Sequence, residues 1–296
     1  MSGGQVVIGV DESVGALAAL QWATDECQLR DSSLLIVHAP QFPSAVAAHG
    51  EAGLRVFDTF GVQLLHELAI LTGSWRSGVN VNTLLSHSAA ADTLVDLSAS
   101  AALIVVGTRG SGGNLLSMTG SVSHRVAAHA HCPVAIVPDT ATIGSGSSHG
   151  AIAVGVANSQ AGRASLQFAL AEASRRRARV LAVRAYGDDS LTSAELDAAD
   201  PELRAQAESS LVASLAEYSV EFPDVEVQPL LTRDDPTHAI LRAAQQADLV
   251  VLGCHHSDDR WSTRLGPVPS SVLHRAGCPV IVVGTAPRPA LGGFGR

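Results

Sequence analysis

The sequence predicts an α/β protein made of two tandem, doubly wound domains, each a five-stranded parallel sheet with helices on both faces. Three observations lead to this prediction. The chain has 296 residues, about twice the roughly 150-residue size of a common domain. Its residue pattern returns after a fixed interval, and within each copy short apolar runs alternate with segments of helical period. With 46% hydrophobic and 16% charged residues, extended disorder is excluded.

The repeat runs without gaps from the first expected strand to the last. Three segments return: Ile8–Val10 as Val154–Val156, Leu103–Gly107 as Leu249–Gly253, and Cys132–Val134 as Cys278–Val280. The interval is 146 residues each time, as from Gly9 to Gly155. One domain is therefore expected twice, at residues 1–141 and 149–288, joined by a Gly/Ser-rich linker.

The elements of the first copy follow from its apolar pattern. Strands are expected at Val6–Val10, Leu34–Ala39, Val79–Leu85, Leu103–Val106 and Val134–Val137. A first helix is expected behind Ser13 as its N-cap, with further helices at 54–71, 92–98 and 120–130. Nearly all-apolar strands are typical of a parallel sheet that is covered on both faces. Ligands of such sheets bind beyond the carboxyl ends of the strands.

Charge excludes several classes of function. All 19 basic residues are arginine, so a Schiff-base lysine and the lysine of a Walker A loop are absent. The net charge of −9 argues against a nucleic-acid partner. The one dense basic run, Arg175–Arg177 with Arg179, is expected to close a helix end.

Cysteine spacing and hydropathy bear on location. The four cysteines form no C-x-x-C pair, which fits a reducing cytoplasm. The first residues carry no basic segment followed by a long apolar run, and no apolar stretch approaches the length of a membrane span. We expect a cytoplasmic protein with no membrane partner.

A glycine-rich loop follows the fourth expected strand. Gly107 and Gly110 have no Cβ, so the backbone can approach an anion there. The segment Gly120–Ser123 opens a helix, whose first N–H groups, with the hydroxyls of Ser121 and Ser123, can bind phosphate oxygens. The alternative is that this loop only connects two elements.

Two further positions favour a nucleotide. Asp11 comes directly after the first strand, where its carboxylate can accept hydrogen bonds from a ribose or an adenine amine. Ala39 and Pro40 come at the end of the second strand, with no bulky side chain, and leave room for a flat ring.

The spacing Gly107-x-x-Gly110, nine residues, then Gly120-Ser121, with Gly9–Asp11 upstream, resembles the nucleotide-binding signature of the universal stress protein family. The duplication is similar to that of its tandem actinobacterial members. The resemblance implies the strand order 3-2-1-4-5, with ATP between the first and fourth strands. It implies ATP contacts at Gly9, Val10, Asp11, Ala39, Gly107, Gly110, Gly120, Ser121, Val122 and Ser123. Arg109 is the cation that the loop itself offers, and Mg²⁺ or Mn²⁺ with the ATP stays open.

The second copy lacks much of this pattern. Across the 146-residue interval Asp11 becomes Ala157, Gly110 becomes His256, and Ser121 and Ser123 become Pro267 and Pro269; the glycines Gly155, Gly253 and Gly266 remain. The prolines remove both hydroxyls and N–H donors. We expect one ATP per chain, in the first domain. A metal site at Cys254–His256 is a weaker alternative to a purely structural second half.

The family resemblance implies an ATP-dependent regulator of stress survival and growth. The alternatives are a slow ATPase, because a loop with one arginine and no clear general base does not favour fast phosphoryl transfer, and a scaffold in which ATP or a cyclic nucleotide is structural. The two domains are expected to pair within the chain through their last strands, and the chain to form a homodimer. No catalytic residue, no metal ligand and no particular protein partner is predicted.

Overall fold

The computed structural model describes residues 4–40, 50–108, 121–139, 149–186, 193–254 and 265–285. These residues form two compact units, one up to residue 139 and the other from residue 149. Each unit is an α/β sandwich with its own core, as the repeat predicts.

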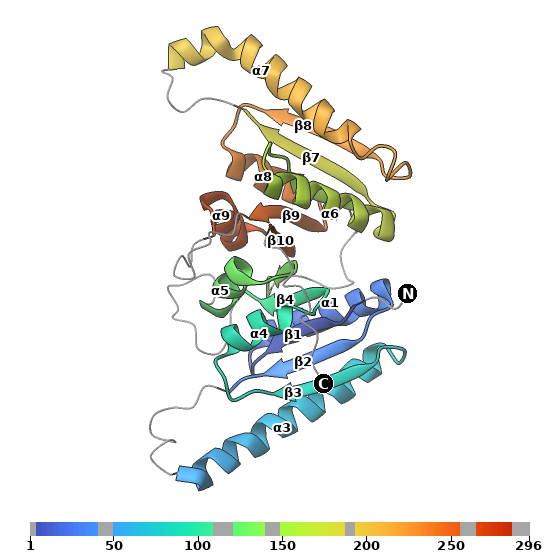
Figure 1. Cartoon of the computed structure of the whole chain (residues 1–296), viewed down its shortest axis with the longest axis vertical. Helices are drawn as coiled ribbons and strands as arrows, with labels where there is room; N and C mark the ends of the chain where they lie inside the picture. Colours follow the sequence, from blue (N-terminus) through green and yellow to red (C-terminus); the bar gives the residue numbers. More distant parts are fainter. Residues whose placement is uncertain are drawn as a thin grey trace, which may run out of the picture. The chain divides into compact units, whose positions relative to one another are not determined.

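The first unit contains a five-stranded parallel sheet in the order β3-β2-β1-β4-β5 (Figure 1). Its strands are β1 (Val6–Val10), β2 (Leu34–His38), β3 (Val81–Leu85), β4 (Leu103–Gly107) and β5 (Val134–Val137). This is the order that the family resemblance implies. The central strands are buried along nearly their whole length because helices cover both faces.

Two layers of helices cover this sheet. They are α1 (Val14–Arg30) and α3 (Gly50–Trp75), which contact each other, and α4 (Ala90–Ser98) and α5 (Ser121–His129), which likewise contact each other. The predicted helices are confirmed, but α3 extends beyond residues 54–71 at both ends. The strand expected from Val79 begins at Val81, and Val79 belongs to the turn before it.

The second unit repeats the arrangement in the order β8-β7-β6-β9-β10. Its strands are β6 (Ala151–Gly155), β7 (Arg179–Ala185), β8 (Val227–Thr232), β9 (Leu249–Cys254) and β10 (Val280–Gly284). Its helices are α6 (Gln160–Arg176), α7 (Ser193–Ala216), α8 (Pro236–Ala244) and α9 (Pro267–Arg275). The helix α8 contacts α9, as α4 contacts α5 in the first unit.

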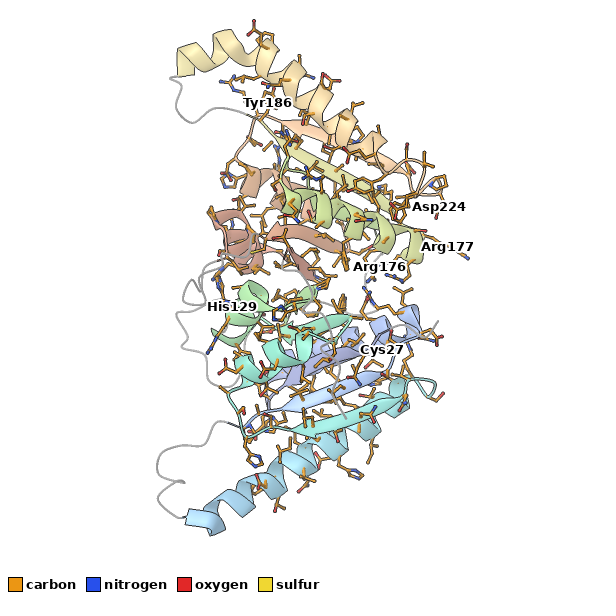
Figure 2. All side chains as sticks on the ribbon, in the orientation of Figure 1. Cys27, His129, Arg176, Arg177, Tyr186 and Asp224 are labelled. Carbon is orange, nitrogen blue, oxygen red and sulfur yellow. The ribbon has the colours of Figure 1, made fainter. Side chains whose placement is uncertain are left out.

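The first helix of each unit begins and ends in the same way. The hydroxyl of Ser13 accepts a hydrogen bond from the Ala16 N–H at 3.1 Å, which confirms the predicted N-cap, and Ser159 does the same with Gly162. The helices end at Asp31 and Arg177, both in the left-handed conformation. The basic run therefore does close α6, where Figure 2 labels two of its arginines.

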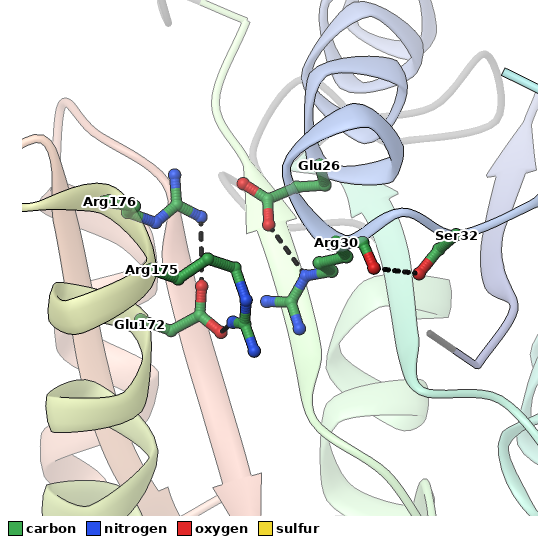
Figure 3. A network of polar contacts seen from close by, with 6 residues as sticks. All are labelled: Glu26, Arg30, Ser32, Glu172, Arg175 and Arg176. Carbon is green, nitrogen blue, oxygen red and sulfur yellow. Dashed lines mark hydrogen bonds and ion pairs between the residues drawn. The ribbon is translucent and has the colours of Figure 1, made fainter. Parts of the chain in front are cut away.

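Each of these helices also buries a glutamate in its last turns. Glu26 on α1 is 2% exposed and binds Nε of Arg30 at 2.9 Å. Its repeat on α6, Glu172, is 1% exposed and binds Arg175 and Arg176 (Figure 3). A buried carboxylate needs such partners because desolvation of its charge is costly. The arginines at this helix end therefore have a pairing role beyond the expected helix-dipole effect.

Candidate functional site

The carboxyl edge of the first sheet gathers the residues that follow β1, β2 and β4. Val10 lies opposite His38, and Ile8 lies opposite Val105. Because these strands are parallel and in register, Asp11, Ala39 and the end of β4 at Gly107 reach the same edge.

Asp11 is held in the turn that starts α1. Its Oδ1 accepts a hydrogen bond from the Ser13 N–H at 3.0 Å, while the Ser13 hydroxyl caps the helix. The Asp11 side chain is half-buried. This turn orients the carboxylate at the centre of the sheet edge, where β1 lies between β2 and β4.

Gly9 has a packing role in the structure. A Cβ at Gly9 would lie 2.7 Å from Cδ1 of Leu94 on α4. At the repeat position, a Cβ on Gly155 would lie 3.2 Å from Cδ1 of Ile240 on α8. In both units the missing side chain makes room for the helix packed on this face.

The glycine that ends the fourth strand has a similar explanation in the second unit. A Cβ on Gly253 would come within 2.3 Å of the Ala161 carbonyl oxygen in α6, which no side chain tolerates. Gly253 repeats Gly107. Close approach of the first helix is therefore a reason for glycine at this position that is independent of any ligand.

The predicted loop residues are only partly described. Arg109, Gly110 and Gly120 lie outside the described residues, and Ser121 is described only as the first residue of α5. In the first turn of α5, Val122 is half-buried and Ser123 is 2% exposed. At the base of the loop, the Thr108 N–H donates to the Val137 carbonyl at 3.0 Å, so the loop starts from a fixed point on β5.

His38 is a residue at this edge that the sequence analysis missed. It ends β2 next to Ala39, is 6% exposed, and has Nδ1 3.0 Å from the Val10 carbonyl oxygen. Comparison of the two copies could have identified His38. Across the 146-residue interval His38 corresponds to Arg184, which is also polar and binds the carbonyl of Val156, the repeat of Val10.

In the second unit the helix after β9 starts with prolines. Pro267 is the first residue of α9 and Pro269 the third, so two N–H donors are missing from the first turn. The corresponding residues of α5 are Ser121 and Ser123, which retain their N–H groups. The helix start of the second unit therefore has fewer N–H groups to offer to an anion.

The comparison with known proteins agrees with this geometry. Residues 4–138 and 149–284 each match the model of the Universal stress protein family. The chain belongs to this family. Universal stress protein Rv2623 of Mycobacterium tuberculosis is 32% identical over 284 residues, which cover 94% of this chain and 95% of that protein. Universal stress protein Rv2005c of the same organism is 30% identical over 288 residues, with 94% and 96% covered.

Solved structures support the fold. A universal stress protein from Archaeoglobus fulgidus superposes with a TM-score of 0.71 at 16% identity, covering 97% of this chain and all of that chain. A putative universal stress protein from Pseudomonas aeruginosa superposes with a TM-score of 0.58 at 17% identity, covering 95% and 93%. These likenesses show two tandem domains of the family fold.

Other predicted features can be placed in part. Of the Cys254–His256 cluster only Cys254 is described, and the described residues contain no group of three or more metal-ligating side chains. No disulfide joins the four cysteines, Cys27, Cys132, Cys254 and Cys278, all of which are described. No helix in the described ranges has both the length and the apolar character to cross a membrane.

Proposed function

We propose that the chain is an ATP-binding regulator of stress response or growth, with one ATP site in its first domain. The observation that carries this proposal is the meeting of Asp11, Ala39 and the Gly107 loop at one edge of the sheet. Edges of this kind hold ligands in doubly wound folds. The glycine spacing of the loop and the family membership both support a nucleotide as the ligand.

Each group has a distinct role in this proposal. The Asp11 carboxylate accepts hydrogen bonds from the ribose, and the small Ala39 side chain leaves space for the adenine. The phosphates bind to the backbone of Gly110 and Gly120, to the start of α5 and to Arg109. Mg²⁺ or Mn²⁺ bound to the phosphates would offset repulsion between ATP and the carboxylates of Asp11 and Glu12.

Regulation is favoured over catalysis because the site offers few cationic groups. Fast phosphoryl transfer requires charge stabilisation around the transferred group and a positioned nucleophile. The chain has no lysine, and Arg109 is the one arginine in the sequence from Gly107 to Gly120. We expect hydrolysis to be slow and ATP to act by stabilising one state of the protein.

The proposal is tested by calorimetric titration of ATP into the wild type and the Asp11→Ala variant. The variant should bind ATP about tenfold more weakly or worse, since it loses charge-assisted hydrogen bonds. Asp224→Ala is the matched control, because it removes an exposed carboxylate from the second domain, where Asp224 accepts a hydrogen bond from the Ser174 hydroxyl at 2.7 Å. Unchanged ATP affinity in Asp11→Ala would refute the site.

The ligand and its regulatory role need separate measurements. Mass spectrometry of small molecules released from the purified protein should identify ATP, and a cyclic nucleotide in its place would replace ATP in the proposal. Cells that carry Asp11→Ala should lose the effect of the protein on growth or stress survival. If every phenotype persists without ATP binding, the scaffold alternative is correct.

Assembly and location complete the proposal. We expect a homodimer in the cytoplasm, where four free thiols stay reduced. Sedimentation velocity should give the mass of two chains, and a monomer at all concentrations would exclude the dimer. Pairing of the two domains within the chain stays a prediction.

A further inference from the structure

The second unit has an arginine at the sheet edge that corresponds to the ATP site of the first. Arg184 lies near the end of β7 and is half-buried. Its Nη1 donates to the Val156 carbonyl at 3.4 Å and to Oδ1 of Asn158 at 3.0 Å. Both acceptors lie in the segment that directly follows β6, so the guanidinium links β7 to the end of the neighbouring strand.

The described residues that accept hydrogen bonds from this guanidinium do not neutralise its charge. Both acceptors are uncharged, and no carboxylate in the described ranges forms an ion pair with Arg184. Burial lowers the pKa of Arg184 because desolvation disfavours its charged form. The groups Nε and Nη2 keep N–H donors that have no hydrogen-bond partner among the described residues.

Asn158 adds a second donor group. Its Oδ1 accepts from Arg184 and also from the Ser210 hydroxyl at 2.7 Å. Because a guanidinium can only donate, this contact fixes which end of the amide is oxygen. The Nδ2 group therefore stays available as a donor beside the guanidinium.

The acidic residues of the adjacent loop have other partners. Asp234 binds Nη2 of Arg242 at 2.5 Å, and Asp235 caps α8 by accepting from the His238 N–H at 3.1 Å. Neither carboxylate is paired with Arg184. Among the described residues, the cation is thus positioned by neutral groups, while Asp234 and Asp235 bind Arg242 and the start of α8.

Comparison of the two copies shows that three positions of this edge change in charge. Across the 146-residue interval Asp11, Glu12 and His38 become Ala157, Asn158 and Arg184. Two carboxylates are removed and a guanidinium is gained, while both copies keep the contact to the carbonyl that ends the first strand. Loss of the ribose acceptor alone would not require a half-buried cation at position 184.

We propose that the second domain binds a small oxyanion, a phosphate or carboxylate group of a metabolite, at Arg184 and Asn158. A planar guanidinium forms two parallel hydrogen bonds with either group, and the Asn158 amide supplies another donor. The inference goes beyond the proposed ATP site, because it concerns another domain and a ligand without an adenosine requirement.

The test is a nuclear magnetic resonance titration of the arginine Nε–Hε signals in the full-length protein. Sodium phosphate and disodium succinate are added separately at constant ionic strength. The Arg184 signal, assigned by its loss in Arg184→Gln, should shift and saturate with at least one of the two anions. Saturation with phosphate alone would show that the site takes a phosphate group, and saturation with succinate alone would show that it takes a carboxylate group.

Two variants separate a specific site from general charge screening. Asn158→Asp places a carboxylate on Arg184 and should weaken anion binding by about tenfold or more without removing the arginine. Arg163→Gln removes an exposed arginine of α6 and should leave the Arg184 titration unchanged. Shifts that grow linearly without saturation, or that are equal for several arginines, would overturn the proposal.

The result is distinguishable from failure of the ATP site. Asp11→Ala should lose ATP binding and keep the phosphate or succinate titration of Arg184. If Arg184 responds to ATP but to neither small anion, the second domain binds a nucleotide and the small-oxyanion assignment is wrong.

Discussion

Cys27 and Cys278 are thiols whose protonation is coupled to folding. Burial raises the pKa of Cys27 to about 12 and that of Cys278 to about 11, because desolvation disfavours the thiolate. Both values lie above the ordinary value of 9.0, so the folded state holds these protons more tightly than the unfolded state. The resulting stabilisation is fully present below pH 9 and is lost as the pH rises toward the folded-state values.

We predict that the free energy of unfolding falls more steeply with alkaline pH in the wild type than in Cys27→Ala. Alanine fits this position, since the repeat residue Ala173 is 0% exposed on α6. Urea unfolding at about pH 8 and at about pH 10 measures the slope. Equal slopes in the two proteins would mean that the Cys27 thiol titrates normally in the folded state.

At the scale of elements, the two N-caps should contribute equally to stability. Ser13→Ala and Ser159→Ala each remove a hydroxyl that accepts one helix N–H at 3.1 Å, and each should cost about 1 kcal/mol of unfolding free energy. Ser13→Ala keeps the backbone N–H that holds Asp11, so ATP affinity should change little. Denaturant melts and ATP titrations of both variants check this, and a large loss of ATP affinity in Ser13→Ala would show that its hydroxyl takes part in binding.

We expect that position 253, where β9 contacts α6, tolerates no side chain. Gly253→Ala brings Cβ against the Ala161 carbonyl, so strand and helix must separate, which we expect to cost about 2 kcal/mol or more. Gly277→Ala is the control, because a Cβ there meets nothing within 4 Å. Thermal unfolding of the two variants compares them, and equal stability would contradict the packing explanation.

These elements also show what a sequence can predict. The strands β1 and β5 have their predicted bounds, and Ser13 caps α1, because apolar runs and capping residues act locally. The longer α3 was not predicted, since its added turns follow no apolar pattern. The sequence placed Asp11 and Ala39 after their strands, and the parallel register brings them to one edge.

Other site features depend on partners that are distant in sequence. The burial of Glu26 follows from how α1 packs, and the glycine at Gly253 is explained by a carbonyl on α6. The contact of Arg184 with Asn158 joins residues 26 positions apart, on β7 and after β6. The hydrophobic pattern of a short segment does not predict contacts between distant residues. Comparison of the two copies would nevertheless have identified Arg184 and His38 as polar residues at one repeat position.

At the scale of the whole molecule, duplication has preserved the scaffold and changed the sheet edges. Both units keep the strand order, the first-helix caps and the buried glutamates. Their edges differ in the acidic pair Asp11 and Glu12 of the first copy and in Arg184 of the second. Two domains of one fold are therefore expected to bind different ligands.

Titration calorimetry should accordingly give one ATP per chain. The second unit lacks the ribose acceptor at Ala157, and Pro267 and Pro269 remove N–H donors from the first turn of α9. Restoring the carboxylate with Ala157→Asp should not create a second ATP site, because the prolines remain and the new carboxylate lies one residue from Asn158, the partner of Arg184. Two equivalent ATP sites in the wild type, or a second site gained by Ala157→Asp alone, would contradict the assignment of different ligands to the two copies.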